Sequence, residues 1–137
     1  MIAPWRPLPE LNEENAYFWK SGADGHLRFL HCRPCDYFIH PPSPVCPQCL
    51  EFTPKPNVVS GKATVRSVPI NYLPWGSGLP TPYAIAIVGL DEQDDLNLTT
   101  NVVGTEPHAV RRGDRVKVVF EGHGVTHVPL FEPAAAR

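Results

Sequence analysis

The chain has 137 residues, a formal net charge of −2 at pH 7 and 17 prolines. Its length suits one domain, or one domain with a small appended module, and the many prolines argue against long helices. Because the Lys and Arg residues are scattered and offset by carboxylates, we expect no nucleic-acid partner.

The N-terminal stretch MIAPWRPLPELNEEN lacks a basic start followed by an apolar run. A membrane-spanning helix needs a run of about 18 apolar residues, and the sequence has none. We therefore expect a cytoplasmic protein with no signal peptide and no membrane association.

The first predicted element is a short helix within ELNEENAYFWKSG, in an N-terminal segment expected to span residues 1–26. Asn12 can cap this helix and Gly22 can end it. Its aromatic residues exceed what one narrow stripe can bury. They can pack on the rest of the chain or face a partner, and the candidates for partner contact are Tyr17, Phe18 and Trp19.

All four cysteines lie in the stretch LHCRPCDYFIHPPSPVCPQCL, as two C-x-x-C pairs. Two disulfides would need an oxidising compartment, and a thioredoxin-like site would need one C-x-x-C that opens a helix. Two tight turns that aim four thiolates at one point instead indicate a tetrahedral metal site. The predicted ligands are Cys32, Cys35, Cys46 and Cys49.

The predicted module is a rubredoxin-like zinc ribbon over residues 27–53. A closed four-sulfur shell leaves no position for water, so we expect a structural zinc ion without a catalytic role. Iron is the less favoured alternative, because four thiolates accept either metal. His31 and His40 flank the site as possible spare ligands. Leu50 and Asp36 each follow a cysteine pair, a position where Gly is common. A left-handed backbone at Leu50 would therefore be strained, because leucine has a Cβ atom and glycine has none.

Residues 54–137 contain five runs rich in Val, Ile and Thr, which predict strands. The runs are GKATVRSVPI, YAIAIVGL, LNLTTNVVG, RVKVVFE and GVTHVPLF. Between the third and fourth runs, a short helical turn is expected from Pro107 to Gly113. This order predicts a five-stranded OB-fold barrel within a mainly β protein.

Two loops of the predicted barrel stand out. The acidic run DEQDD, residues 91–95, suggests a cation site, but a solvated hairpin turn is the favoured interpretation. The loop NYLPWGSGLPTP carries Tyr72 and Trp75, which are candidates for contact with a ligand or a partner protein.

No residue pattern indicates a catalytic site. The sequence has no G-x-S-x-G elbow, no H-E-x-x-H and no phosphate-binding Gly loop, and metal binding would leave no cysteine as a nucleophile. A lone histidine is more often a surface or hydrogen-bonded residue than an acid–base catalyst. This interpretation covers His26, His108, His123 and His127, so we expect that the chain is not an enzyme.

The order of helix, C-x-x-C ribbon and barrel resembles the acyl-CoA-associated zinc-ribbon and OB-fold proteins, domain-of-unknown-function family 35. The matching stretches run from about Leu8 to Pro133 and include ENAYFWKSGADGHLRFLHCRPCDYFIHPPSPVCPQC, RRGDRVKVVFE and VPLFEP. Residues Cys32, Cys35, Cys46 and Cys49 match the family's metal ligands by position.

The resemblance implies a non-catalytic accessory subunit in lipid or steroid metabolism. Such proteins associate with thiolases, thiolase-like aldolases and, in some systems, acyl-CoA hydratases. Acyl-CoA would then lie at the shared interface of a hetero-oligomer, which the subunit helps to bind, channel or shield. The identity of the acyl group, the reaction of the partner and the stoichiometry stay open.

A nucleic-acid-binding protein is the alternative function, because ribbons and OB barrels both occur in such proteins. That function would place stacking aromatics among Lys and Arg residues on the strands. The runs YAIAIVGL and LNLTTNVV together carry one aromatic residue and no basic residue, so the accessory subunit is favoured.

Overall fold

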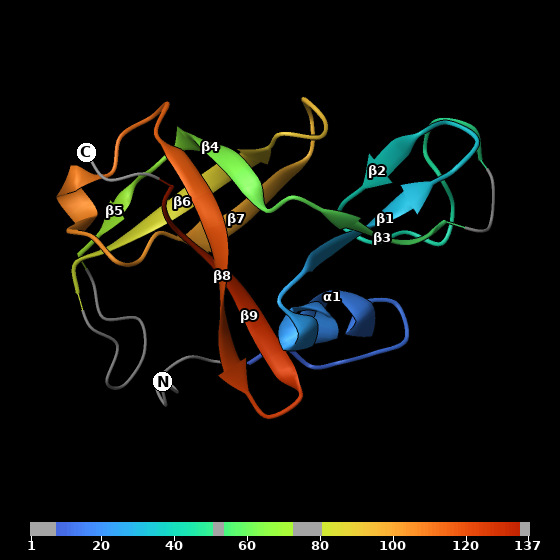
Figure 1. Ribbon diagram of the computed structural model, residues 1–137, viewed down its shortest axis with the longest axis horizontal. Coiled ribbons are helices and arrows are strands. Elements are labelled where there is room, and N and C mark those ends of the chain that lie inside the picture. Colours follow the sequence, from blue (N-terminus) through green and yellow to red (C-terminus); the bar gives the residue numbers. More distant parts are fainter. Residues whose placement is uncertain (1–7, 51–53, 73–80, 135–137) are drawn as a thin grey trace.

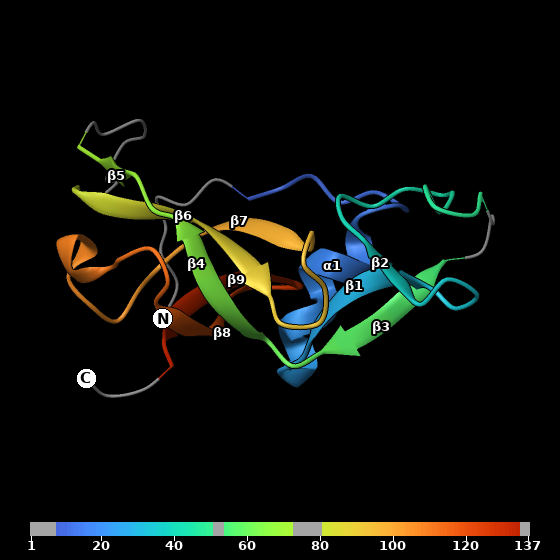
Figure 2. The same ribbon diagram turned by 90° about the horizontal axis from the view of Figure 1, so that it is seen from above.

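The computed structural model describes residues 8–50, 54–72 and 81–134. In this part the chain is mainly β, with nine strands in two sheets and one short α-helix (Figure 1). The ribbon lies at one end of the molecule and the barrel at the other, and α1 lies at their junction (Figures 1 and 2).

The N-terminal helix is shorter than predicted. It comprises α1 (Ala16–Lys20), which continues into the 3₁₀ helix η1 (Ser21–Asp24). The side chain of Asn12 accepts backbone N–H groups of the turn that leads into α1, the nearer one at 2.8 Å. Gly25, with φ of 83°, caps η1 in the left-handed conformation.

The prediction that Gly22 ends the helix is therefore wrong. Gly22 is buried within η1, where a Cβ atom would lie 2.3 Å from Cδ1 of Phe120 on β8. A glycine is needed here because an aromatic ring packs against the backbone.

The ribbon sheet contains β1 (Leu27–Cys32), β2 (Tyr37–Ile39) and β3 (Lys55–Val59), in the antiparallel order β2-β1-β3. Strand β3 follows the expected domain boundary at residue 53, yet it pairs with β1 along its whole length, from Leu27↔Val59 to His31↔Lys55. The sheet that supports the cysteines is thus completed by chain that follows them.

The second sheet forms the barrel. Its strands are β4 (Lys62–Ser67), β5 (Ile70–Asn71), β6 (Tyr83–Leu90), β7 (Asn97–Asn101), β8 (Arg115–His123) and β9 (Thr126–Pro133). The strand order is β5-β6-β4-β8-β9. Strand β7 lies outside this order and also pairs with β6. A parallel bridge between Val102 and Phe131 joins the chain after β7 to β9, which closes the OB-fold.

Each of the five predicted runs forms a strand, but the predicted count of five strands is too low. The end of the first run folds back as the two-residue β5, which pairs with β6, so the sheet has six strands. The predicted helical turn is the 3₁₀ helix η2 (Pro107–Ala109), and Gly113 lies beyond it in a turn with φ of 93°.

One hydrophobic core joins the helix, the ribbon and the barrel. Phe18 of α1 and Leu27 and Phe29 of β1 belong to the same buried cluster as Val65 of β4 and Phe131 of β9. Both Phe29 and Phe131 are 0% exposed. Because β1 contributes to this core, the ribbon and the barrel fold as one packed unit.

The acidic loop between β6 and β7 fastens the barrel to the edge of the ribbon. The amide of Gln93 accepts the N–H of Phe38 and donates to its carbonyl, both at 2.8 Å, as a neighbouring strand would. Beside it, the hydroxyl of Tyr37 donates to Asp95 at 2.7 Å, which lowers the pKa of that carboxyl. We call Gln93 and Asp95 with these partners the polar clamp.

The other acids of the loop also bind protein groups. Asp91 pairs with Arg115 at 2.7 Å, and Glu92 accepts the N–H of Ser60 at 2.7 Å. The only group of metal-binding side chains found in the described residues is the four cysteines. The loop is therefore a turn, as favoured from the sequence. Its carboxylates bind Arg115 and the backbone of Ser60 in the same chain.

Replacing Gln93 with alanine should lower the free energy of unfolding by about 1–3 kcal/mol, because both backbone groups of Phe38 would lose their partner. Denaturant titration measures this loss, and hydrogen exchange should show faster exchange of the Phe38 amide. Asp94→Ala is the matched control, since that side chain is exposed in the same loop. Equal losses in the two variants would contradict the clamp.

Candidate metal centre

Two chain segments bring the four cysteines together. Cys32 ends β1 and Cys35 lies in the turn that leads to β2, while Cys46 and Cys49 lie in a second turn further along the chain. All four sulfur atoms lie within 4.8 Å of one another, and Sγ of Cys32 is 3.5 Å from Sγ of Cys49. A tetrahedron of sulfur atoms about 2.3 Å from a central zinc has edges of about 3.8 Å, so this arrangement can hold a metal ion.

The environment of the thiols favours a cation at their centre. Cys32 and Cys46 are buried, Cys35 is half-buried and Cys49 is exposed. The pKa of the Cys35 thiol is raised to about 12, mainly by its hydrogen bond with the neighbouring Cys49 thiol. Several thiolates in so small a space repel one another, and a divalent cation removes that repulsion.

The residues that follow each cysteine pair adopt left-handed backbone conformations. Asp36 has φ of 53° and Leu50 has φ of 65°. The N–H of Leu50 donates to the carbonyl of Cys46 at 2.8 Å, which closes the second turn. The sequence correctly indicated that these are positions where glycine would adopt the backbone conformation with less strain.

Leu50→Gly should raise the free energy of unfolding by about 0.5–1 kcal/mol. Glycine removes the cost of the left-handed backbone, and the leucine side chain is 69% exposed, so little packing is lost. Thermal or denaturant unfolding measures the gain. Leu50→Ala is the control, because alanine keeps the strain; a similar gain with alanine would show that backbone strain is not the cause.

Neither flanking histidine joins the sulfur cluster. Nε2 of His31 lies 2.8 Å from Oδ1 of Asp36, and its ring packs on Phe38 with centroids 4.6 Å apart. His40 lies between Phe18 and Phe29, 5.0 Å from each ring centroid. His31 therefore braces the first cysteine turn, and His40 belongs to the aromatic packing at the junction.

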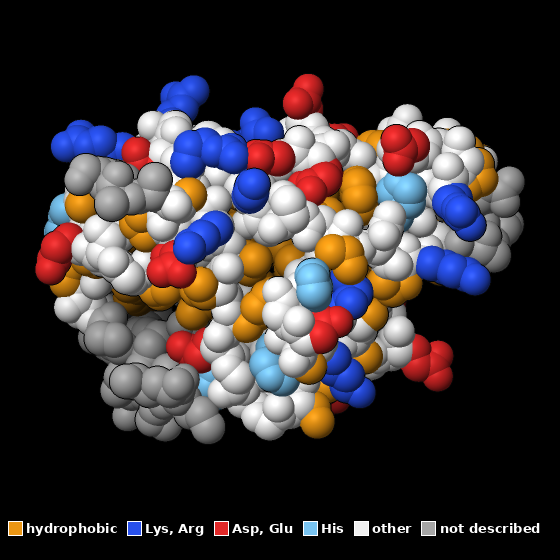
Figure 3. All heavy atoms as spheres, viewed as in Figure 1, with side chains coloured by type: hydrophobic (Ala, Val, Ile, Leu, Met, Phe, Trp, Pro, Cys, Tyr) orange, Lys and Arg blue, Asp and Glu red, His pale blue; other side chains and the backbone are white. Residues whose placement is uncertain are grey.

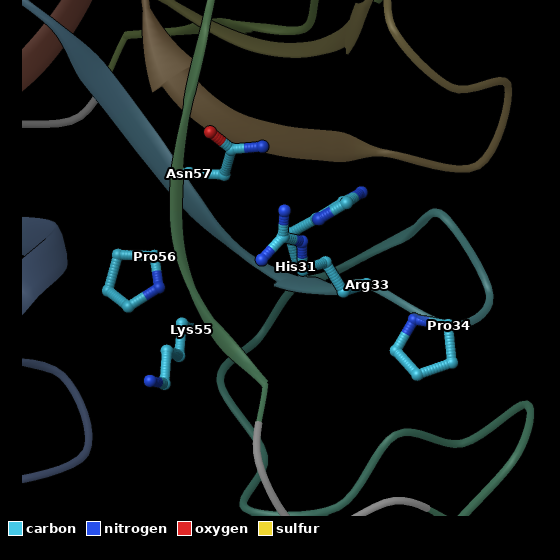
Figure 4. Close-up of a pocket in the computed structure, with 6 residues that line it drawn as sticks. All are labelled: His31, Arg33, Pro34, Lys55, Pro56 and Asn57. Atoms are coloured by element: carbon cyan, nitrogen blue, oxygen red, sulfur yellow. The ribbon is translucent and has the colours of Figure 1, made fainter.

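A shallow pocket lies beside the first cysteine turn, between β1 and β3. His31, Arg33, Lys55 and Asn57 are among its lining residues. Figure 4 shows the Arg33 guanidinium beside the His31 ring, whereas the Lys55 side chain points to the other side of the pocket. The two cations do not converge on one point, so the pocket is not a built anion site.

The predicted partner-contact residues have different environments. Phe18 is 3% exposed and belongs to the core, whereas Tyr72 is 60% exposed and its hydroxyl lies 2.6 Å from Nε2 of His108. Tyr17 accepts the N–H of Leu30 at 3.2 Å, and burial raises its pKa to about 12. Trp19 is half-buried against the core, and Trp75 lies outside the described residues.

The sequence did not indicate the roles of Gln93 and His40. Gln93 is one amide among acidic residues, and His40 is one histidine between the two cysteine pairs. Their partners are on other elements, so no local pattern could have identified them.

In Figure 3, many Lys and Arg side chains gather along the upper left of the molecule, with several Asp and Glu side chains beside them. In the described residues, no helix is both long enough and apolar enough to cross a lipid bilayer.

The four-thiol ribbon fused to an OB barrel defines a protein of the zinc-ribbon and OB-fold class. Comparison with family models gives the particular family. The model "ChsH2, rubredoxin-like zinc ribbon domain" matches residues 19–54, and the model "ChsH2, C-terminal OB-fold domain" matches residues 57–121. The chain belongs to the ChsH2 family, domain-of-unknown-function family 35.

Two of the solved structures that are similar to this chain illustrate the match. One is described as the Ltp2-ChsH2(DUF35) aldolase; it has a TM-score of 0.83 and 29% identity, and the match covers 93% of this chain and 100% of that one. The other is a DUF35 protein of unknown function from Sulfolobus solfataricus, with a TM-score of 0.63, 17% identity and coverage of 88% and 85%. The second match supports the fold alone.

A curated relative is also similar in sequence. The "Probable enoyl-CoA hydratase alpha subunit" of Thermomonospora curvata is 31% identical over 130 residues, which cover 94% of this chain. The chain spans only 40% of the length of that relative.

Proposed function

We propose that this chain is a non-catalytic accessory subunit that binds a thiolase or thiolase-like aldolase and helps to bind, channel or shield its acyl-CoA substrate. The observation that carries the proposal is the similarity, over 93% of the chain, to the ChsH2 domain in a structure described as an aldolase. The name of the hydratase relative gives weaker support for a hydratase as the partner.

The chemistry of the described residues is consistent with an accessory role. The four thiols lie in one cluster, where a metal would occupy every sulfur. His31 contacts the carboxyl of Asp36 at hydrogen-bond distance, and His40 packs on Phe18. Catalytic groups would then belong to the partner.

Co-expression with a thiolase-like protein encoded beside this chain tests the proposal. A stable hetero-oligomer on a sizing column is expected, with higher activity or solubility of the enzyme than when it is expressed alone. Two species that elute independently, or thioester turnover by the isolated chain, would contradict the proposal.

We further propose that Cys32, Cys35, Cys46 and Cys49 hold one structural zinc ion. The soft thiolate set and the family's ribbon module support zinc, and iron is the competitor. Metal analysis of the purified protein should give one zinc per chain and no visible absorbance. A red protein with one iron per chain would contradict the zinc assignment.

A further inference from the structure

The four cysteines differ in how far solvent reaches them. Cys49 is exposed and Cys35 is half-buried, whereas Cys32 and Cys46 are buried. A dissolved peroxide oxidises a cysteine only where it can reach the sulfur atom, so exposed thiolates react before buried ones. A peroxide would therefore meet Cys49 before the other three cysteines.

A second sulfur atom lies within reach of Cys49. Sγ of Cys32 is 3.5 Å from Sγ of Cys49, and a disulfide bond is about 2.05 Å long, so an approach of about 1.5 Å would join them. Cys46 lies in the same turn as Cys49, but its sulfur already accepts the N–H of Gln48 at 3.4 Å. The geometry therefore favours Cys32 as the partner of Cys49.

A bond between Cys32 and Cys49 would link two separate parts of the ribbon. Cys32 ends β1, which also carries Phe29 of the shared core, and Cys49 lies 17 residues further along, in the second cysteine turn. A metal ion held by the four sulfur atoms would link the same two parts. A bond between Cys46 and Cys49 would stay within one turn and would not link it to β1. A disulfide from Cys32 to Cys49 can therefore replace the metal as the link that closes the ribbon.

We propose that Cys49 is a peroxide-sensitive site, and that its oxidation converts the zinc-bound ribbon into a metal-free form closed by a disulfide from Cys32 to Cys49. This inference rests on the proposed zinc ion and does not depend on the proposed aldolase partner.

The oxidation takes two steps, with hydrogen peroxide as the oxidant. The Cys49 thiolate attacks one peroxide oxygen, the O–O bond breaks and hydroxide leaves, which gives a sulfenic acid at Cys49. The Cys32 thiolate then attacks the Cys49 sulfur, and a second hydroxide leaves as the S–S bond forms. The two sulfur atoms supply the two electrons that reduce the peroxide. Because only thiolates bind zinc tightly, the metal loses two of its four ligands.

Zinc release and disulfide mapping test the proposal on the full, zinc-loaded chain. A few molar equivalents of hydrogen peroxide should release one zinc per chain to a chromogenic chelator, and dithiothreitol with added zinc should reverse the change. Chymotrypsin cleaves within the YF stretch between the two cysteine pairs, so mass spectrometry should find two peptides joined by Cys32 and Cys49. Retention of the zinc, a bond from Cys49 to another cysteine, or irreversible oxidation of Cys49 without a disulfide would overturn the proposal.

A matched pair of variants identifies the partner of Cys49. Cys32→Ser and Cys35→Ser each remove one sulfur atom from the first cysteine pair. After peroxide treatment, Cys35→Ser should still form the disulfide, whereas Cys32→Ser should accumulate a sulfenic acid at Cys49 that dimedone traps. Equal disulfide yields in the two variants would overturn the role of Cys32.

If either variant fails to fold, limiting N-ethylmaleimide on the native zinc-loaded chain gives a second measurement. Cys49 should be alkylated first, because it is the exposed cysteine. A preference for any other cysteine would overturn the proposal.

Melting temperatures show whether the disulfide replaces the metal. The oxidised, metal-free chain should melt about 10 °C above the reduced, metal-free chain, because the bond joins residues 17 apart. Equal melting temperatures would overturn the closing role of the disulfide. Metal analysis before oxidation separates this inference from the zinc assignment: a chain that purifies without zinc refutes that assignment, whereas a zinc-loaded chain that peroxide leaves unchanged refutes the oxidation site alone.

Discussion

Cys46→Ser is expected to lower the free energy of unfolding by more than about 4 kcal/mol and to abolish stoichiometric metal binding. Cys46 is 0% exposed, and its sulfur belongs to the cluster of four sulfur atoms that lie within 4.8 Å of one another. The variant would lose one ligand of the proposed metal ion and would leave a buried hydroxyl among thiols. Calorimetry or circular dichroism gives the stability, and metal analysis gives the stoichiometry.

The control for this prediction is His31→Ala. His31 lies beside the cluster but pairs with Asp36, so its loss should leave one metal ion per chain. If Cys46→Ser fails to accumulate, chelation of the native protein gives the same information. A native chain that keeps its melting temperature after complete metal removal would contradict a structural role.

Phe29→Ala is expected to lower the free energy of unfolding by about 3–5 kcal/mol, because it leaves a cavity where the ribbon meets the barrel. Phe29 is 0% exposed on β1 and packs on Phe18 at 5.8 Å and on His40 at 5.0 Å. The variant should also loosen the ribbon against the barrel, which faster hydrogen exchange in both sheets would show.

Val58→Ala is the matched control for Phe29→Ala. Val58 lies on the neighbouring strand β3 and is 43% exposed, so its replacement should change the stability by no more than about 0.5 kcal/mol. A comparable loss in both variants, or a loss in Phe29→Ala that leaves barrel exchange unchanged, would contradict a shared core.

The sequence was sufficient for the four-cysteine cluster and the order of modules. Two C-x-x-C pairs specify tight turns whose geometry is local, and the five apolar runs specify strands through their own composition. Even the backbone strain at Leu50 follows from its position after a cysteine pair, and the structure gives φ of 65° there. These features need no knowledge of distant neighbours.

The tertiary structure decided the features that depend on partners far away in the chain. Gly22 packs against the ring of Phe120 and does not end the helix. Strand β3 completes the ribbon sheet, although it follows the cysteines in the sequence. Gln93 hydrogen-bonds to Phe38 at the edge of β2, and the ring of His40 packs on Phe29. Local patterns report a residue's own conformation, whereas burial and hydrogen-bond partners are set only when separate strands pack against each other.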